Sequence, residues 1–340
     1  MKALKKYRWP LTGALLGVLV FLAVYGVRVL DPTSVDWILN SLSPDPIQHY
    51  LGWELFRRSP VHLPYIGANY NAVYPFRTSV LFTDSLPLAA LFFKLLGGIL
   101  PMRFQYFGWW GLLCYALQGG LAQAVIARIA GVQPTFGRDD KSKAAISMSP
   151  GQTAKLWGSV LGAGVLVLFP ALTIRMFAHT ALAANWLVLL ALYLWLRSDE
   201  LMPTTRRACL IWGGMGLLCA GIHLYYLPMV GLVLVGYAVR RALQKRGPAA
   251  VLAPIAAFCA AALAELVLLG AFAVNFAGYS NGYLSGADYF GLFVPWLAQS
   301  WEQNVYAGVG TSLAVVLAVF GIVCNARKAC LLYTSPSPRD

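Results

Sequence analysis

The stretch SLPLAALFFKLLGGIL, Ser85 to Leu100, decides the fold of this chain, because its place in a membrane sets the side of every later loop. It is largely apolar, but it is only about 16 residues long and contains Pro87 and Lys94. A helix needs about 20 apolar residues to cross a bilayer. The sequence therefore allows two topologies: the stretch crosses the membrane, or it lies along or dips into the outer leaflet.

The composition of the whole chain indicates a polytopic membrane protein. Hydrophobic residues make up 59% of it, charged residues 11%, and the mean hydropathy is +0.64, far from the values of a soluble domain. The net charge of +13 could indicate a nucleic-acid partner, but the lysines and arginines stand in short runs between apolar spans. The positive-inside rule expects this placement. We therefore expect membrane lipids as partners, and no nucleic acid.

An apolar run from Leu11 to Leu30 follows the basic N-terminus MKALKKYRWP. A cleaved signal peptide is the competing interpretation. However, the run is long for a signal peptide, and no small-x-small cleavage site precedes Asp31. We expect an uncleaved first span, with the N-terminus in the cytoplasm and the polar loop after it outside.

The basic residues decide between the two topologies. If Ser85–Leu100 does not cross, the inward-facing segments hold 18 of the 26 lysines and arginines. If it crosses, all but the first four of these face outward, against the positive-inside rule. We therefore predict a juxtamembrane or re-entrant helix, which is allowed where protein buries its backbone. The expected fold is an all-α integral membrane protein with about eight transmembrane helices, near residues 10–30, 104–127, 157–177, 181–196, 209–226, 228–239, 249–272 and 306–325.

This topology gathers polar side chains on the outer side. Seven of the thirteen acidic residues lie there, and so do all four histidines, His49, His62, His179 and His223. The six cysteines fall in spans or near the inner face, so no disulfide framework is predicted. No zinc-type cysteine and histidine spacing occurs either. The long first outer loop, residues 31–103, is the first place to expect a functional site.

Asp45 and His49 lie near the start of the polar segment SPDPIQHYLGWELFRR, Ser43 to Arg58. Asp45 followed by Pro46 is a usual helix start, with Asp as the N-cap. An apolar stripe at every fourth position predicts a helix on the membrane surface: Ile47, Leu51 and Leu55. Asp45 and His49 share another face of this helix, which suits acid–base chemistry. Capping and catalysis both stay open for Asp45, and they are compatible.

Asp84 follows in the segment FTDSLPL, Phe82 to Leu88. Because Thr83 and Asp84 precede an apolar helix, Asp84 either caps that helix or takes a chemical role. If the folded loop brings Asp45 and Asp84 together, the two carboxylates could hold a divalent metal ion or divide base and orienting roles. Their separation of 39 residues does not decide between these possibilities.

Arg175 precedes His179 by one helical turn in RMFAHTAL, at the outer end of the third expected span. An arginine there is either a membrane anchor or, together with the histidine, part of a phosphate site. His223, in GIHLYYLPM, lies near the outer end of the fifth span. It is either a structural residue or part of a polar cavity that the histidines share.

Five segments resemble an uncharacterised bacterial family of GT-C-like membrane proteins: DPIQHYLGWELFRR, FTDSLPLAALFFKLL, FQYFGWWGLLCYALQG, RMFAHTALAANWLVL and IHLYYLPM. The similarity covers most of residues 9–325. The long first outer loop with an early Asp, and the juxtamembrane helix before the second span, also resemble the GT-C superfamily of membrane glycosyltransferases. The resemblance implies a GT-C-like transmembrane domain over residues 1–329 in a bacterial inner (plasma) membrane.

GT-C enzymes transfer a sugar from a polyprenyl-phosphate donor to an acceptor on the outer face of the membrane, here a glycan or another envelope acceptor. The resemblance implies an inverting glycosyltransferase in which Asp45 accepts the proton of the acceptor hydroxyl. It further implies that Arg175 and His179, with Arg57 or Arg58, hold the lipid phosphate. The chain lacks the first-loop Asp-Glu pair and the WWDYG-like motif of better-known branches. The resemblance therefore names neither the donor sugar nor the metal requirement.

Two other classes of function stay open. A lipid or sugar transporter would explain Glu265, an ionisable residue within an expected span, but it predicts inverted repeats, and the sequence shows none. A catalytically silent GT-C-like binding or assembly protein would keep the fold and tolerate Asp45→Asn.

The last segment, CLLYTSPSPRD, has no apolar period and resembles translated sequencing-adaptor read-through at the end of a metagenomic fragment. A short disordered cytoplasmic tail is the competing interpretation. We expect residues 330–340 to be non-native or disordered, and assign them no function.

Overall fold

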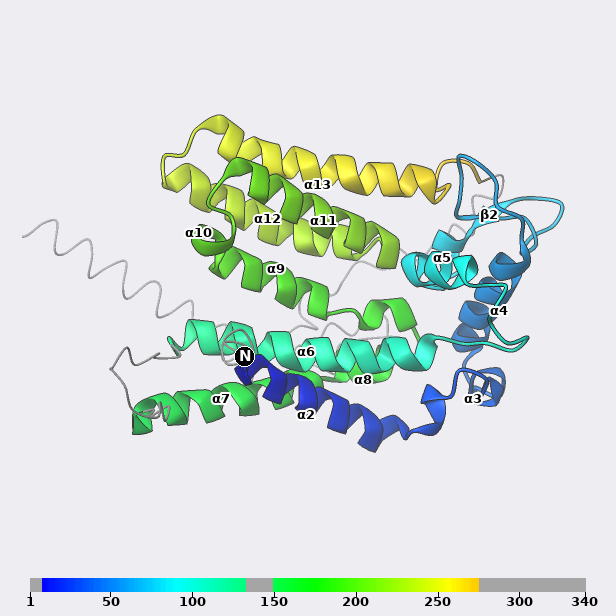
Figure 1. Ribbon diagram of the computed structural model, residues 1–340, viewed down its shortest axis with the longest axis horizontal. Helices are drawn as coiled ribbons and strands as arrows, with labels where there is room; N and C mark the ends of the chain where they lie inside the picture. The colour runs from blue at the N-terminus through cyan, green and yellow to red at the C-terminus, as the bar shows by residue number, and fades with distance from the viewer. Residues whose placement is uncertain (1–7, 133–148, 275–340) are drawn as a thin grey trace, which may run out of the picture. The chain divides into compact units, whose positions relative to one another are not determined.

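The structure is a computed structural model that describes residues 8–132 and 149–274. These residues are mostly helical, with a single pair of very short strands (Figure 1). Three of the described helices are long and apolar enough to cross a membrane: α6 (Phe107–Ile129), α12 (Tyr226–Leu243) and α13 (Pro248–Leu268). The predicted helical class is confirmed. The expected span at 306–325 and the segment 330–340 lie outside the described residues.

One group of helices consists of α2 (Arg8–Tyr25), α6 and α7 (Pro150–Val167), which lie side by side in Figure 1. Small residues let α2 and α6 approach closely, since a Cβ added at Gly17 would collide with the Tyr115 carbonyl. Gln123 of α6 links the two backbones, because its Oε1 accepts a hydrogen bond from the Gly13 amide at 2.7 Å. Small residues and buried amide side chains are the usual means of packing helices in lipid.

A second group consists of four helices: α9 (Trp186–Leu196), α11 (Thr205–Ile222), α12 and α13. In this group α11 packs against α13, and α12 against α9 (Figure 1). At one end the buried Arg241 of α12 donates to Asp199 Oδ1 at 2.8 Å and to the carbonyls of Ser198 and Met202. These contacts hold the short helix α10 (Ser198–Leu201) against α12.

The span expected over residues 157–177 is interrupted, so the prediction of one continuous helix was wrong here. The helix α7 ends at Val167, and α8 (Pro170–Arg175) begins after Phe169, whose backbone is extended with φ −60° and ψ 130°. Pro170 has no amide hydrogen to continue the helix, and it disfavours the helical region for the residue before it. The break makes Arg175 the last residue of a separate short helix.

The polar loop between α2 and α6 folds into short elements: η1 (Arg28–Leu30), α3 (Asp36–Leu39), α4 (Pro44–Arg58), β1 (Ala68–Asn69), β2 (Thr78–Ser79), η2 (Val80–Phe82) and α5 (Pro87–Leu95). The two strands pair antiparallel, with Ala68 opposite Ser79. The Ser79 hydroxyl donates to the Leu269 carbonyl at 2.6 Å. This bond holds the loop against the end of α13, and Figure 1 shows β2 beside that end.

The decisive stretch after Ser85 forms the nine-residue helix α5. At 1.5 Å per residue it is about 14 Å long, less than half of the roughly 30 Å of a bilayer's hydrocarbon core. The short helix predicted here is confirmed. Its side of the membrane stays a prediction.

Ser43, not Asp45, caps α4. The Ser43 Oγ accepts a hydrogen bond from the Asp45 amide at 3.4 Å, and Pro44 is the first helical residue. The predicted start of the helix at Asp45 and Pro46 was therefore wrong by two residues. Asp45 lies in the first turn, and its carboxylate is free to face other parts of the chain.

The buried face of α4 carries its aromatic residues rather than the predicted apolar stripe. Trp53 and Phe56 are fully buried, and the Trp53 Nε1 donates to the Phe104 carbonyl at 3.0 Å. Leu51, in the stripe, is 46% exposed. Ile47 and Leu55, the other two residues of the stripe, are half-buried, so the described residues cover the stripe only in part.

Candidate functional site

Asp84 forms the centre of a cluster of carboxylates and imidazoles. It lies in the turn between η2 and α5, and its Oδ2 is 3.2 Å from the Nε2 of His49. Its Oδ1 is 3.7 Å from the Nε2 of His223, at the end of α11. Three separate elements thus place one carboxylate between two imidazoles. The alternative that Asp84 caps the following helix was wrong, because α5 begins after Leu86 and no side chain caps it.

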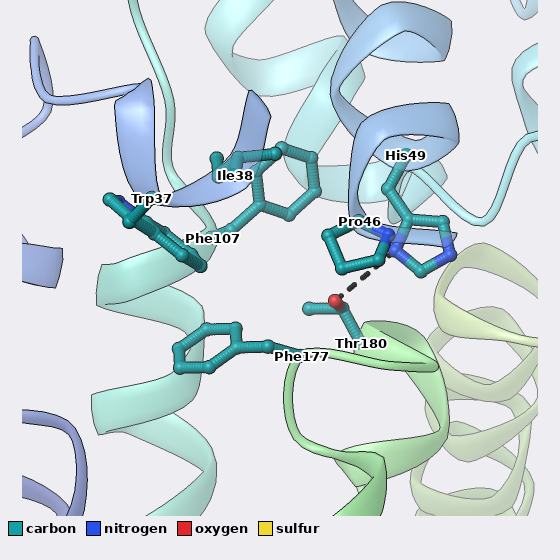
Figure 2. A pocket seen from close by; sticks show the side chains of 7 residues that line it. All are labelled: Trp37, Ile38, Pro46, His49, Phe107, Phe177 and Thr180. Carbon is teal, nitrogen blue, oxygen red and sulfur yellow. Dashed lines mark hydrogen bonds between the residues drawn. The ribbon is translucent and has the colours of Figure 1, made fainter. Parts of the chain in front are cut away.

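His49 is held from both sides of its ring. It is 3% exposed, and its Nδ1 is 3.3 Å from the Thr180 hydroxyl, as the dashed line in Figure 2 marks. Because Nε2 faces a carboxylate, the neutral imidazole carries its proton there, and its Nδ1 accepts a hydrogen bond from the Thr180 hydroxyl. The Ser85 hydroxyl also donates to the His49 carbonyl at 2.7 Å. These contacts fix both the tautomer and the direction of the ring.

The pocket on the Thr180 side of His49 is aromatic and narrow. Figure 2 shows the His49 ring and the Thr180 hydroxyl at one end of it, with Trp37, Phe107 and Phe177 toward the other. It is too narrow to hold a ligand. The Thr180 side of the His49 ring therefore has a packing role only. A chemical role is confined to the side of the ring that faces Asp84.

His223 has a fixed tautomer as well. Its Nδ1 accepts a hydrogen bond from the Tyr225 amide at 3.2 Å, so its ring proton is on Nε2, toward Asp84. The charges of Asp84, His179 and His49 all act on this imidazole. The three histidines therefore form one electrostatic unit around the Asp84 carboxylate.

Asp45 and His179 extend the cluster. The Nε2 of His179 is 4.0 Å from the Oδ2 of Asp45, and the two side chains are 27% and 34% exposed. His179 follows α8, and its amide donates to the Arg175 carbonyl at 2.9 Å. The charges of both Arg175 and Asp84 act on the Tyr226 hydroxyl, so Arg175 lies near the same cluster. This end of the cluster is the more accessible one.

The structure does not bring every predicted residue to the cluster. The Arg57 guanidinium donates to the carbonyls that follow α5, among them Pro101 at 2.8 Å, and Arg58 pairs with Glu54. Both arginines lie about 18 Å along α4 from Asp45, at 1.5 Å per residue. His62 lies apart from the other histidines and packs on the Tyr70 ring, with the ring centroids 4.1 Å apart.

Two residues of the site were missed in the sequence. Thr180 and Ser85 hold His49 through its ring and its carbonyl. The signal for Thr180 was present, since it is a polar residue next to His179 in an apolar stretch. Ser85 follows Asp84 directly, but nothing in the sequence pairs it with α4.

The described residues do not fit a metal site. In residues 8–132 and 149–274, no group of three or more His, Cys, Asp or Glu side chains is arranged to hold a metal ion. Divalent cations such as Mg²⁺ and Ca²⁺ prefer shells of six or more oxygen ligands. The cluster instead pairs each carboxylate with imidazole nitrogens. No metal ion is therefore assigned to the cluster.

An apolar cleft of about 400 Å³ is lined in part by chain neighbours of the cluster. Its lining includes Leu86, two residues after Asp84, and Ile222, directly before His223. The remaining walls come from α5, α6, α9 and α11, and include the three tryptophans Trp109, Trp110 and Trp186. Ligand sites typically have volumes of roughly 300–1,000 Å³ and mostly apolar walls with a few polar groups. The cleft and the cluster together have this composition.

Fold and site thus define a helical protein with candidate membrane spans and a histidine–carboxylate cluster at one end of its helices. The chain belongs to the family described as a domain of unknown function (DUF6311), whose sequence model matches residues 14–335. No curated protein and no solved structure matches the chain.

Proposed function

We propose that this chain is an inverting membrane glycosyltransferase of the GT-C type. It transfers a sugar from a polyprenyl-phosphate-linked donor to a cell-envelope acceptor on the outer face of the bacterial inner membrane. The observation that carries the proposal is a cluster of two carboxylates and three imidazoles, two of which, Asp84 and His223, lie within two residues of lining residues of an apolar cleft of about 400 Å³. A lipid-linked sugar has the matching chemistry, with an apolar tail, an anionic phosphate and a polar sugar.

Arg175 and His179 are the residues that would hold the lipid phosphate. Guanidinium and imidazolium groups bind phosphate oxygens through charge-assisted hydrogen bonds. Arg175 ends α8 near the cluster, and His179 is part of it. Arg57 and Arg58 are left out of this role because both have partners at the far end of α4.

The reaction needs one proton acceptor. The acceptor hydroxyl oxygen attacks the anomeric carbon from the face opposite the phosphate, which inverts the configuration at that carbon. The bond from the anomeric carbon to the phosphate oxygen breaks, and the polyprenyl phosphate leaves with the electron pair. The hydroxyl proton passes to a carboxylate of the cluster, a role that the resemblance gives to Asp45.

The proposal includes a topology of about eight transmembrane helices in a GT-C-like bundle. The N-terminus is cytoplasmic, and the loop of residues 31–103 faces outward. The charge distribution supports this arrangement. A cysteine introduced at Lys94 should react with a membrane-impermeant reagent from the outer side of intact cells. Reaction from the cytoplasmic side alone would mean that Ser85–Leu100 crosses, and would reverse every later loop.

The direct test is a mass-spectrometric profile of lipid-linked sugars and envelope glycans in the source bacterium, with the gene intact and deleted. We expect the deletion strain to accumulate a polyprenyl-linked sugar and to lack the corresponding glycan. An unchanged profile would refute the proposal. If the purified protein then still bound undecaprenyl monophosphate in liposomes, a catalytically silent lipid-binding protein would be the better description.

A further inference from the structure

We infer that Asp84, not Asp45, is the catalytic residue that accepts the proton of the acceptor hydroxyl, and that His49 is the positioning residue that holds it. The inference rests on the proposed glycosyl transfer and assigns one of its steps. Two features carry it, the bonding state of the Asp84 carboxylate and the restraint of its partner His49.

The first feature is an unsatisfied acceptor atom. Asp84 Oδ1 is buried and has no hydrogen-bond partner among the described residues, because the nearest donor, the Nε2 of His223, is 3.7 Å away. A buried acceptor without a donor is unfavourable by about 1–3 kcal/mol, so such atoms in folded proteins need an explanation. A substrate hydroxyl that donates to Oδ1 would remove this penalty.

Asp45 offers no comparable atom. Its Oδ2 is 3.3 Å from the Ser43 hydroxyl, which donates to it, and its side chain is 34% exposed against 17% for Asp84. Water can therefore satisfy Asp45 in the absence of substrate. Of the two carboxylates, Asp84 is the one with a buried oxygen that has no hydrogen-bond partner among the described residues.

The second feature is the restraint of Oδ2. The Nε2 of His49 is 3.2 Å from this oxygen, and the Thr180 hydroxyl fixes the other ring nitrogen. An imidazole held this way restrains the carboxylate through the ion pair and sets the direction of its other oxygen, as the orienting partner does in acid–base pairs. Ser85 adds a contact from the next residue of the chain to the His49 carbonyl. His49 touches Asp84 and no open space, so it acts through Asp84.

The backbone of Asp84 is also held in an uncommon conformation. Its φ is +52°, in the left-handed region that Asp and Asn tolerate better than other residues with a side chain. Leu86, with φ +56°, is also left-handed and is a less tolerant residue type. The turn is fastened between them, because the Tyr106 hydroxyl donates to the Ser85 carbonyl. It aims the carboxylate at the cluster while Leu86 reaches the apolar cleft.

The proton and the electron pair of the reaction each have a destination among the groups named above. The acceptor O–H bond breaks as its oxygen bonds to the anomeric carbon, and the proton goes to Asp84 Oδ1. The bond from the anomeric carbon to the phosphate oxygen breaks, and the negative charge leaves on the polyprenyl phosphate. The proton on Asp84 returns to water after the product departs. General-base catalysis of this kind contributes roughly 10²–10⁴-fold to a rate.

The test compares Asp84→Asn with Asp45→Asn in the full chain. Membranes of the source bacterium supply their own lipid-linked sugars and acceptors, and mass spectrometry follows the rate at which the polyprenyl-linked sugar is consumed. Asn is isosteric with Asp and tolerates the left-handed backbone, so Asp84→Asn should fold. We expect it to slow consumption about 100-fold or more, and to slow it at least about 10-fold more than Asp45→Asn does. Both variants should bind undecaprenyl monophosphate within about twofold of wild type.

The outcomes separate the two claims. If membranes without the protein consume the donor as fast as wild type, the proposed function fails. If the protein is needed but Asp45→Asn is as slow as Asp84→Asn or slower, the proposed function stands and this inference is overturned. Asp84→Glu, which keeps the carboxylate, should retain more activity than Asp84→Asn, and the reverse order would also overturn it. Asp36→Asn, on the exposed face of α3, is the matched control and should match wild type.

Discussion

The Nε2 of His49 lies 3.2 Å from the Oδ2 of Asp84, although the two residues belong to different elements of the polar loop. The contact joins α4 to the turn before α5, and Thr180 extends it to the segment after α8. The His49 imidazole therefore fixes the direction of the Asp84 carboxylate relative to these elements.

Replacing His49 separates orientation from packing. His49→Ala removes a buried imidazole and its ion pair with the Asp84 Oδ2, and we expect a loss of about 1–3 kcal/mol in the free energy of unfolding. Transfer should fall more than stability explains. In His49→Gln the side-chain amide can donate from nearly the same position, so this variant should recover part of both.

Donor consumption in membranes and chemical unfolding in detergent measure the two effects. His62→Gln is the control, because His62 packs on Tyr70 away from the cluster, and it should change neither. Equal losses of transfer in His49→Ala and His49→Gln would show that the donated hydrogen bond to Asp84 has no effect on the reaction.

Thr180 provides a matched pair of variants for the other ring nitrogen. Thr180→Val keeps the shape of the side chain but removes the hydroxyl that bonds His49 Nδ1, a bond worth about 0.5–1.5 kcal/mol. We expect transfer to fall several-fold, with donor binding unchanged. Thr180→Ser keeps the hydroxyl and should restore most of the rate. If Thr180→Ser is as slow as Thr180→Val, the methyl group rather than the hydroxyl matters, and Thr180 does not orient the ring.

The sequence predicted which polar residues lie on the same side of the membrane, but not which of them contact one another. Counting basic residues grouped all four histidines, and three of them do come together: His49 and His223 lie beside Asp84, and His179 lies beside Asp45. Nothing in the sequence distinguishes His62, which packs on Tyr70 instead. The pairing of His49 with Asp84 depends on a tertiary contact, and a spacing along the chain carries no information on such a contact.

Sequence signals for the start and end of a helix were also ambiguous where two of them lay close together. Ser43-Pro44 and Asp45-Pro46 have the same capping chemistry two residues apart, and the structure uses the first. Pro170 was visible, but the apolar run continues through it, so hydropathy predicted one span where the backbone makes two helices. Two helices of the loop, α4 and α5, were predicted because their apolar patterns are local, although the start of α4 was placed two residues too late.

The apolar cleft predicts where donor binding can be blocked. Ala89 of α5 lines the cleft, so Ala89→Phe adds an aromatic ring to a volume of about 400 Å³. We expect affinity for undecaprenyl monophosphate to fall about 10-fold or more, measured by quenching of the cleft tryptophans in liposomes. Leu210→Phe is the control, because Leu210 on α11 is 68% exposed. If Ala89→Phe binds the lipid as well as wild type, the tail binds elsewhere.

The lowered pKa of Lys94 predicts that the stability of the fold, and not the reaction, depends on alkaline pH. It lies on α5 with its Nζ 3.8 Å from the centre of the Phe56 ring, and it donates to the Phe56 carbonyl at 2.8 Å. Burial lowers the pKa of Lys94 from 10.5 to about 8. Between pH 8 and about 10.5 the unfolded chain therefore holds a proton that the folded protein has lost. Stability contributed by this group rises with pH across that window, and it is constant below and above it.

The comparison that isolates this effect is Lys94→Met, which keeps the length of the side chain and removes its titration. Wild-type protein in detergent should show an unfolding midpoint that rises between pH 8 and pH 10 relative to Lys94→Met. Lys155→Met, at an exposed position on α7, should follow wild type. Parallel pH profiles for wild type and Lys94→Met would mean that Lys94 titrates alike in the folded and unfolded chain. Because Lys94 links α5 to the end of α4, its neutral form at alkaline pH would hold the loop as well as the charged form does, and donor consumption should not collapse across the same window.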